Sequence, residues 1–254
     1  MREPAGRDGP VRGPAGEPAS ASHQSRERRV KRGEPVTDTT TGAAMPRQTS
    51  SWVRSGAPAE AARGLVAVHR FPELVVETPR LRVRPLTGAD APEVRAVFDD
   101  RHTQRWLPFP EPYTVDDARL WCTEFAAARR DSGDGDHYGV VRKDDDLLVG
   151  CLWTKRTDWA ARVTQVTYAV GPAARGFGVA CEALDVLSVA LLLEHEFQRV
   201  ELRIAPGNVA SRRVAEKAGF TYEGLLRNAG YTPAGRADLE VWSLVAGDLR
   251  AARS

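Results

Sequence analysis

The sequence contains little that would support a metal site, a disulfide framework or a membrane span. Its three cysteines, Cys122, Cys151 and Cys181, lie far apart and form no CxxC pair, which argues against a zinc site and fits a reducing cytoplasm. The longest purely apolar run late in the chain, residues 189–193, has five residues, far fewer than the ~20 needed to cross a bilayer. The N-terminus has no apolar segment typical of secretory signals. We therefore expect a cytoplasmic protein without a metal ion or membrane association.

An excess of charge of one sign is also missing. The 36 basic and 34 acidic residues leave a formal net charge of +2, which lacks the basic footprint of a dedicated nucleic-acid binder. We therefore expect no specific nucleic-acid partner. Hydrophobic residues make up 42% of the 254 residues, which is enough to form a folded core.

Composition divides the chain into two parts. Residues 1–64 are rich in Gly, Pro, Ser, Thr and Arg and show no hydrophobic periodicity. Such a segment cannot bury enough apolar surface to offset its chain entropy, so we predict a disordered tail over 1–64 and one folded domain over 65–254. A basic tether for RNA or a ribosome is a less favoured interpretation of the tail.

Hydrophobic periodicity changes repeatedly within the second part. Alternating apolar residues predict strands, and apolar residues at helical spacing predict helices. The predicted strands cover 81–86, 138–141, 147–153, 163–170, 199–205, 220–225 and 239–244. The predicted helices cover 91–98, a segment beginning at Thr114, 176–197 and 208–218. This order predicts an α/β (α+β) domain with a mixed sheet of about seven strands and four helices.

The segment from Val170 to Ala180 carries the clearest chemical signal. A predicted strand ends there, a turn with Gly176 and Gly178 follows, and a helix begins. Backbone N–H groups at a helix start form an anion site, and glycines let a ligand approach the backbone. Arg175 adds positive charge, so a pyrophosphate group is the expected ligand. The third glycine of a dinucleotide fingerprint is absent because Cys181 occupies that position.

A second segment, residues 208–220, narrows the range of families that the glycine turn indicates. The pattern Arg175-Gly-x-Gly-x-Ala180 is followed by Asn208-x-x-Ser211 and by Lys217-Ala-Gly-Phe220. Together these motifs resemble the GCN5-related N-acetyltransferase (GNAT) superfamily, and within it the RimJ/RimL-type ribosomal-protein N-terminal acetyltransferases. The resemblance covers roughly residues 73–250. It implies a GNAT-type domain that uses acetyl-CoA as co-substrate and an amine as acceptor.

The resemblance also implies a binding mode. Family members hold the CoA pyrophosphate on backbone amides of the glycine turn and place the pantetheine arm between two splayed strands, here 163–170 and 199–205. The residue that matches Asn208 bonds the CoA arm. The implied cofactor-binding residues are Tyr168, Val170, Arg175, Gly176, Phe177, Gly178, Val179, Ala180, Asn208 and Ser211. A strand N–H near Tyr168–Val170 is the expected donor to the tetrahedral oxyanion.

The catalytic acid is where the sequence departs from much of the superfamily. Many members carry a tyrosine seven residues after the asparagine, but here that residue is Ala215. Ser211 is our substitute as proton donor to the leaving sulfur. The alternative is that Ser211 only bonds the helix backbone, and Tyr222 or water would then supply the proton.

The sequence also leaves more than one candidate for the general base. The subgroup often has glutamate where this chain has Gln165, which cannot accept a proton. Glu182 fits the subgroup's motif and is a catalytic candidate, although a structural role is the more common one for such a residue. Asp158 and His137 are looser candidates.

A set of aromatic residues precedes the glycine turn and is a candidate for binding the acceptor. In the family this half builds the acceptor pocket. The aromatic residues concerned are Trp106, Phe109, Tyr113, Trp121, Trp153 and Trp159. Trp121 fits a core position at helical spacing, whereas Trp106 lies in a proline-broken loop and is a candidate to face the acceptor.

We conclude from the sequence that the chain is an acetyl-CoA-dependent N-acetyltransferase. The acceptor is a primary amine on a peptide N-terminus or a small molecule, and the protein is a monomer or a homodimer. A catalytically inactive acyl-CoA-binding module is the alternative, because both Gln165 and Ala215 replace reactive residues of the family. A nucleotide-dependent oxidoreductase is less favoured since the third glycine is missing.

Overall fold

The computed structural model describes residues 69–251; the predicted tail and its boundary at residue 65 lie outside this range. The strands are β1 (Val76–Glu77), β2 (Leu81–Pro85), β3 (His137–Arg142), β4 (Leu147–Asp158), β5 (Val163–Val170), β6 (Arg199–Ile204), β7 (Thr221–Thr232) and β8 (Gly235–Leu244). The helices are η1 (Gly88–Asp90), α1 (Ala91–Phe98), α2 (Arg101–Gln104), α3 (Val115–Leu120), η2 (Trp121–Phe125), α4 (Ala126–Asp131), η3 (Pro172–Ala174), α5 (Val179–Leu193), α6 (Val209–Lys217) and α7 (Ala246–Ala251).

The strands of the described part form one mixed sheet. Their order is β1-β2-β3-β4-β5-β6-β8-β7, and every neighbouring pair is antiparallel except β5 with β6. This confirms the predicted mixed α/β domain. The sheet has eight strands instead of about seven because β1 is only two residues long, too short to show alternation. The helices exceed the predicted four because α2 and α7 are short segments that periodicity missed.

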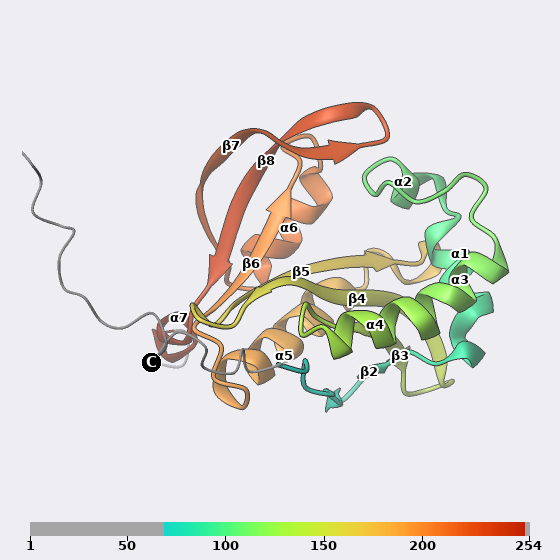
Figure 1. Ribbon diagram of the computed structural model, residues 1–254, viewed down its shortest axis with the longest axis horizontal. Helices are drawn as coiled ribbons and strands as arrows, with labels where there is room; N and C mark the ends of the chain where they lie inside the picture. Colours follow the sequence, from blue (N-terminus) through green and yellow to red (C-terminus); the bar gives the residue numbers. More distant parts are fainter. Residues whose placement is uncertain (1–68, 252–254) are drawn as a thin grey trace, which may run out of the picture. The chain divides into compact units, whose positions relative to one another are not determined.

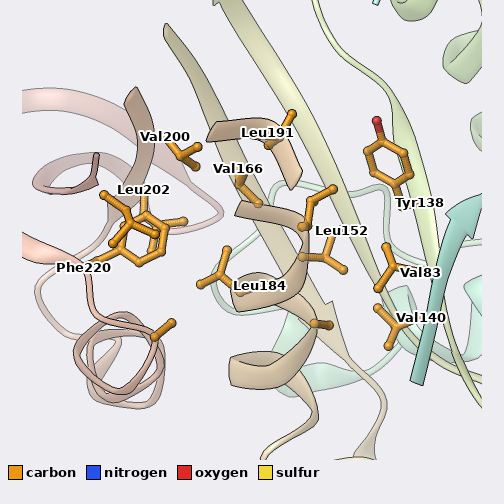
Figure 2. Packing of buried hydrophobic residues seen from close by; sticks show 14 of the residues in the cluster. Val83, Tyr138, Val140, Leu152, Val166, Leu184, Leu191, Val200, Leu202 and Phe220 are labelled. Carbon is orange, nitrogen blue, oxygen red and sulfur yellow. The ribbon is translucent and has the colours of Figure 1, made fainter. Parts of the chain in front are cut away.

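The larger part of the core lies between the sheet and α5. Leu184, Leu187 and Leu191 of α5 are each fully buried against apolar residues of the strands. Figure 2 shows side chains such as Leu152 and Val166 gathered around this helix. Burying a side chain of this size contributes roughly 1.5–3 kcal/mol, so α5 is the main element that closes this face of the sheet.

A second core cluster fills the opposite face. It joins α1 and the α3–η2 segment to β4 and the end of β5 (Figure 1). Phe98 lies at its centre and contacts Phe109, Tyr113, Trp121 and Trp153 in stacked or edge-on geometry. The expectation that Trp121 is a core residue is therefore confirmed.

Local signals explain where several helices begin and end. Thr114 caps α3 as predicted, since its hydroxyl accepts a hydrogen bond from the Asp117 backbone. The predicted helix 176–197 was too long at both ends. Gly176 and Gly178 have φ values of +83° and +79° and Glu196 has φ +57°, backbone conformations that no right-handed helix contains. Helix α5 therefore covers only Val179–Leu193.

The prediction of two short final strands was also wrong. Strands β7 and β8 form one long hairpin through Thr232 and Gly235, whereas the predicted strands covered only 220–225 and 239–244. Its register shifts twice, between Tyr222 and Gly224 and between Leu226 and Gly230. Each bulge breaks the two-residue alternation by which strands are recognised.

Candidate active site

An opening in the sheet dominates the candidate site. Strands β5 and β6 pair only where Val163–Gln165 face Arg199–Glu201. Beyond that point β5 continues to Val170 and β6 to Ile204 without pairing with each other, and Figure 1 shows the two strands diverging. Their facing backbone groups need partners from outside the sheet. The splay that the resemblance implied is therefore present, and an extended chain bearing amide groups fits it.

The glycine turn follows β5 at the open end of this gap. Gly176 and Gly178 both have positive φ, and a Cβ atom at Gly176 would meet nothing within 4 Å. Phe177 between them is exposed. Gly178 is the N-cap of the 15-residue helix α5, whose first N–H groups and dipole favour an anion. The turn thus offers open backbone and positive potential for a pyrophosphate.

Arg175 is turned away from the glycine turn. Its Nε donates to the Val170 carbonyl oxygen at 2.9 Å, and its guanidinium forms an ion pair with Asp100 and contacts Thr103 Oγ1 at 3.3 Å. Asp100 is also the N-cap of α2, where it accepts from the Thr103 backbone. The side chain therefore joins the turn to α2, a contact between residues far apart in sequence.

Glu182 is held by the β1–β2 hairpin. Its carboxylate accepts from Thr78 Oγ1 and forms an ion pair with Arg80, which also donates to the Phe177 carbonyl oxygen. Burial raises the pKa of Glu182, but the hydrogen bonds from Arg80 and Thr78 lower it by more, so the pKa lies below its ordinary value. A carboxylate so held is a weak base, and this arrangement favours a structural role at the start of α5.

Two hydroxyl groups meet across the opening. The Tyr168 hydroxyl lies 2.7 Å from Ser211 Oγ and 3.1 Å from the Ser211 carbonyl oxygen. This pair connects β5 to the first turn of α6. Burial raises the pKa of Tyr168, while its hydrogen bond to Ser211 opposes the rise, so the phenol stays protonated at neutral pH. The sequence indicated only a backbone role near Tyr168, because no local pattern signals the spatial partner of its hydroxyl.

Asn208 and Ala215 flank this pair on α6. Asn208 caps the helix, and its Oδ1 accepts from the Ser211 backbone at 3.1 Å. Ala215, where many family members have tyrosine, is fully buried in the core cluster next to α5. No side-chain proton donor is available at that position. Ser211 and Tyr168 are the hydroxyl groups that the fold places nearby.

The two weaker candidates for the general base, His137 and Asp158, have other contacts in the structure. His137 is buried, stacks on Trp121 at 3.9 Å between ring centroids, and its Nδ1 lies 2.9 Å from the Trp121 carbonyl oxygen. Burial lowers the pKa of His137 to about 4, so the ring is neutral and enclosed. Asp158 accepts a hydrogen bond from the Ala161 backbone at 2.9 Å in the β4–β5 turn. These contacts favour structural roles for both.

Three segments form the rim of the candidate site: the loop after α2, the β6–α6 turn and the β7–β8 turn. Trp106, in the loop after α2, lies against the β6–α6 turn, since a Cβ atom at Gly207 would be 3.2 Å from its ring. A surface hollow lies between this loop and the β7–β8 turn and is lined by Arg101, Gln104, Arg105, Glu111 and Pro233. Tyr113, Trp121 and Trp153 are instead buried core residues, and Trp159 packs with Phe71 and Phe197. Of the aromatic set, Trp106 is the residue that reaches this rim.

The chain belongs to the acetyltransferase (GNAT) domain family, whose model matches residues 80–221, more than half of the chain. It is 26% identical to the uncharacterized N-acetyltransferase YoaA of Bacillus subtilis over 171 residues, which is 67% of this chain and 96% of that protein. It is 32% identical to the "Probable N-acetyltransferase YjcK" of the same organism over 57% of this chain and 82% of that protein. The predicted family is thus confirmed.

Solved structures share the fold. Mycobacterium smegmatis RimJ in complex with CoA-disulfide superposes with a TM-score of 0.64 at 22% identity, covering 73% of this chain and 97% of that chain. A RimL ribosomal L7/L12 acetyltransferase in complex with coenzyme A gives 0.62 at 17% identity, over 68% and 98% of the two chains. Within residues 69–251, no helix has the length and apolarity to cross a membrane, and no three metal-binding side chains cluster.

Proposed function

We propose that this acetyltransferase moves an acetyl group from acetyl-CoA directly to a primary amine, on a protein N-terminus or a small molecule. The observation that carries the proposal is the unpaired stretch of β5 and β6, with the glycine turn at its open end and the Tyr168–Ser211 pair across it. RimJ and RimL structures of the same fold contain CoA-derived ligands, which supports the same use of this opening.

In this proposal the backbone of Arg175–Ala180 and the first turn of α5 bind the pyrophosphate. Free backbone groups of Val166–Val170 bond the amides of the pantetheine arm, with the Asn208 side chain at its other side. An N–H group between Tyr168 and Val170 stabilises the oxyanion that forms when the amine attacks the thioester carbon. The protonated Tyr168–Ser211 pair then supplies a proton to the departing sulfur.

The identity of the acceptor is tested with a panel of peptides and amines. Peptides beginning with Ser, Ala or Met, aromatic and aliphatic monoamines, and spermidine are each incubated with acetyl-CoA. Release of free thiol and a mass increase of the amine product are both measured. We expect stoichiometric thiol and N-acetylated product with at least one class of amine. Tight CoA binding without transfer to any amine would instead support the alternative, an acyl-CoA-binding module.

A further inference from the structure

Two polar side chains beside the opening have no partner among the described residues. Gln165 is the last residue of β5 that pairs with β6, so it marks the closed end of the gap. Its Oε1 is buried and accepts no hydrogen bond. Lys155 lies directly opposite it on β4, and no residue of 69–251 forms a hydrogen bond or ion pair with its ammonium group. A buried polar atom without a partner, such as Gln165 Oε1, is uncommon and calls for an explanation.

Both side chains project from the face of the sheet opposite α5. Trp153 and Thr167, two residues away on each strand, also pair directly, and Trp153 belongs to the cluster beneath α1 and η2. Side chains alternate along strands, so Lys155 and Gln165 continue that row. Opposed Cβ atoms in such a pair are about 4.5–5.5 Å apart. A small ligand group can therefore contact both side chains.

The position along β5 relates this pair to the reacting atoms. The glycine turn begins beyond Val170, five residues from Gln165. At about 3.3 Å per residue, this is ~17 Å of unpaired strand. An acyl arm anchored by its phosphates at the turn and lying along the strand therefore carries its thioester towards Gln165.

Burial and two nearby guanidinium groups disfavour the ammonium form of Lys155. Burial lowers the pKa of Lys155 to about 8, Arg156 on the same strand and Arg129 of α4 lower it as well, and Asp134 opposes them. Asp134 is already paired with Arg129 at 2.7 Å. On β6, Glu201 beyond Gln165 is paired with Arg199 and Arg203. On β3, His137 opposite Trp153 is neutral.

We propose that Lys155 is the base that takes a proton from the acceptor ammonium, and that Gln165 Oε1 positions the same nitrogen by accepting its hydrogen bond. This rests on the proposed N-acetyltransferase function. The ammonium loses one proton to Lys155 Nζ, and its lone pair forms the C–N bond while the C–S bond breaks with its electrons on sulfur. The nitrogen loses its second proton, the sulfur gains one, and Lys155 releases the other to solvent. One ammonium and one thioester thus give one amide, one thiol and one proton.

The first test uses two substitutions of Lys155 and the most active amine of the panel. Lys155→Met removes the base while keeping the chain length, and Lys155→Arg keeps a charge that cannot dissociate. Each should lower kcat by about 10²-fold or more, with KM for acetyl-CoA within a factor of about two. In the wild type, kcat should fall below an apparent pKa near 8. That acidic limb should disappear in Lys155→Met.

Introducing a carboxylate base at position 165 gives a more decisive test of the role of Lys155. Adding Gln165→Glu to Lys155→Met should recover at least tenfold of the lost kcat and move the acidic limb to lower pH, because a carboxylate then accepts the proton. A purely structural role of Lys155 predicts no such rescue. Lys143→Met, on the exposed β3–β4 turn, is the matched control and should leave kcat and its pH profile unchanged. Equal CoA affinity of all variants by calorimetry establishes that they fold.

The second test does not depend on turnover. Trace labelling of the full chain with acetic anhydride at a series of pH values, read by mass spectrometry, gives the apparent pKa of each lysine. We expect Lys155 to titrate near 8. Titration of Lys155 above pH 10, or a Lys155→Met enzyme that retains kcat and the acidic limb, would overturn the assignment. Failure of every amine in the wild type would instead refute the proposed function, which the panel detects separately.

Discussion

Replacing Tyr168 with phenylalanine removes one hydroxyl and leaves the ring in place. That hydroxyl has two contacts, with Ser211 Oγ at 2.7 Å and the Ser211 carbonyl oxygen at 3.1 Å. One net hydrogen bond is worth about 1 kcal/mol, so Tyr168→Phe should lower the free energy of unfolding by about 1–2 kcal/mol. For a domain of this size, about 1 kcal/mol corresponds to a fall of about 2–4 °C in Tm.

The effect on turnover separates catalysis from structure. If the hydroxyl protonates the departing sulfur, its contribution exists only in the transition state. General acids contribute roughly 10²–10⁴-fold, and a thiol with an ordinary pKa of ~8.5 is already a fair leaving group. We therefore expect kcat to fall by about 10²-fold at most, with KM for acetyl-CoA nearly unchanged.

The assay compares Tyr168→Phe, Ser211→Ala and the double variant by stopped-flow thiol release and thermal unfolding. If Ser211 passes a proton through Tyr168, the double variant should be no slower than the slower single variant. Tyr222→Phe makes the same chemical change on exposed β7 and tests the alternative donor; kcat should not change there if Tyr168 supplies the proton. A lower Tm with kcat intact in Tyr168→Phe would refute the acid role and leave the pair as a brace between β5 and α6.

Three further outcomes follow from individual contacts. Gly178→Val places a branched side chain at φ +79° and should weaken CoA binding more than tenfold by calorimetry; unchanged affinity would refute the pyrophosphate site. Arg175→Met breaks the ion pair with Asp100 and should cost about 1–2 kcal/mol in urea unfolding, so an unaltered midpoint would argue against this contact. The lowered pKa of His137, about 4, means that its neutral form favours folding fully above pH ~6.5 and that up to about 3 kcal/mol is lost as the pH falls to 4; His137→Phe should flatten this slope.

Local chemistry made part of this structure predictable. The glycine turn after β5, the cap at Thr114 and the cap at Asn208 depend on residues within a few positions of one another. Each is determined by backbone conformation or a short-range hydrogen bond, which residue type alone indicates. The sequence also predicted strands at the positions of β3 to β6, but not the order in which they pair in the sheet.

Other features depend on contacts that no local pattern records. Arg175 reaches Asp100 and Glu182 reaches Arg80, so two residues assigned to the cofactor and to catalysis have partners about 75 and 102 positions away. The Tyr168 hydroxyl meets Ser211 across 43 positions. Alternation predicted that Tyr168 lies on β5, but only the splay of the sheet determines what its hydroxyl contacts.

Ala215 and Gln165 are the two departures from the family pattern, and our proposal accounts for both in the same way. Ala215 supplies no acid from α6, yet a protonated hydroxyl reaches Ser211, on the same helix, from Tyr168 on β5. Gln165 supplies no base from β5, yet an amine with a lowered pKa lies opposite it on β4. In our proposal, a group on a neighbouring strand supplies the missing proton chemistry in each case. Because proton transfer depends on position and pKa and not on which strand carries the group, the loss of both residues is weak support for an inactive module.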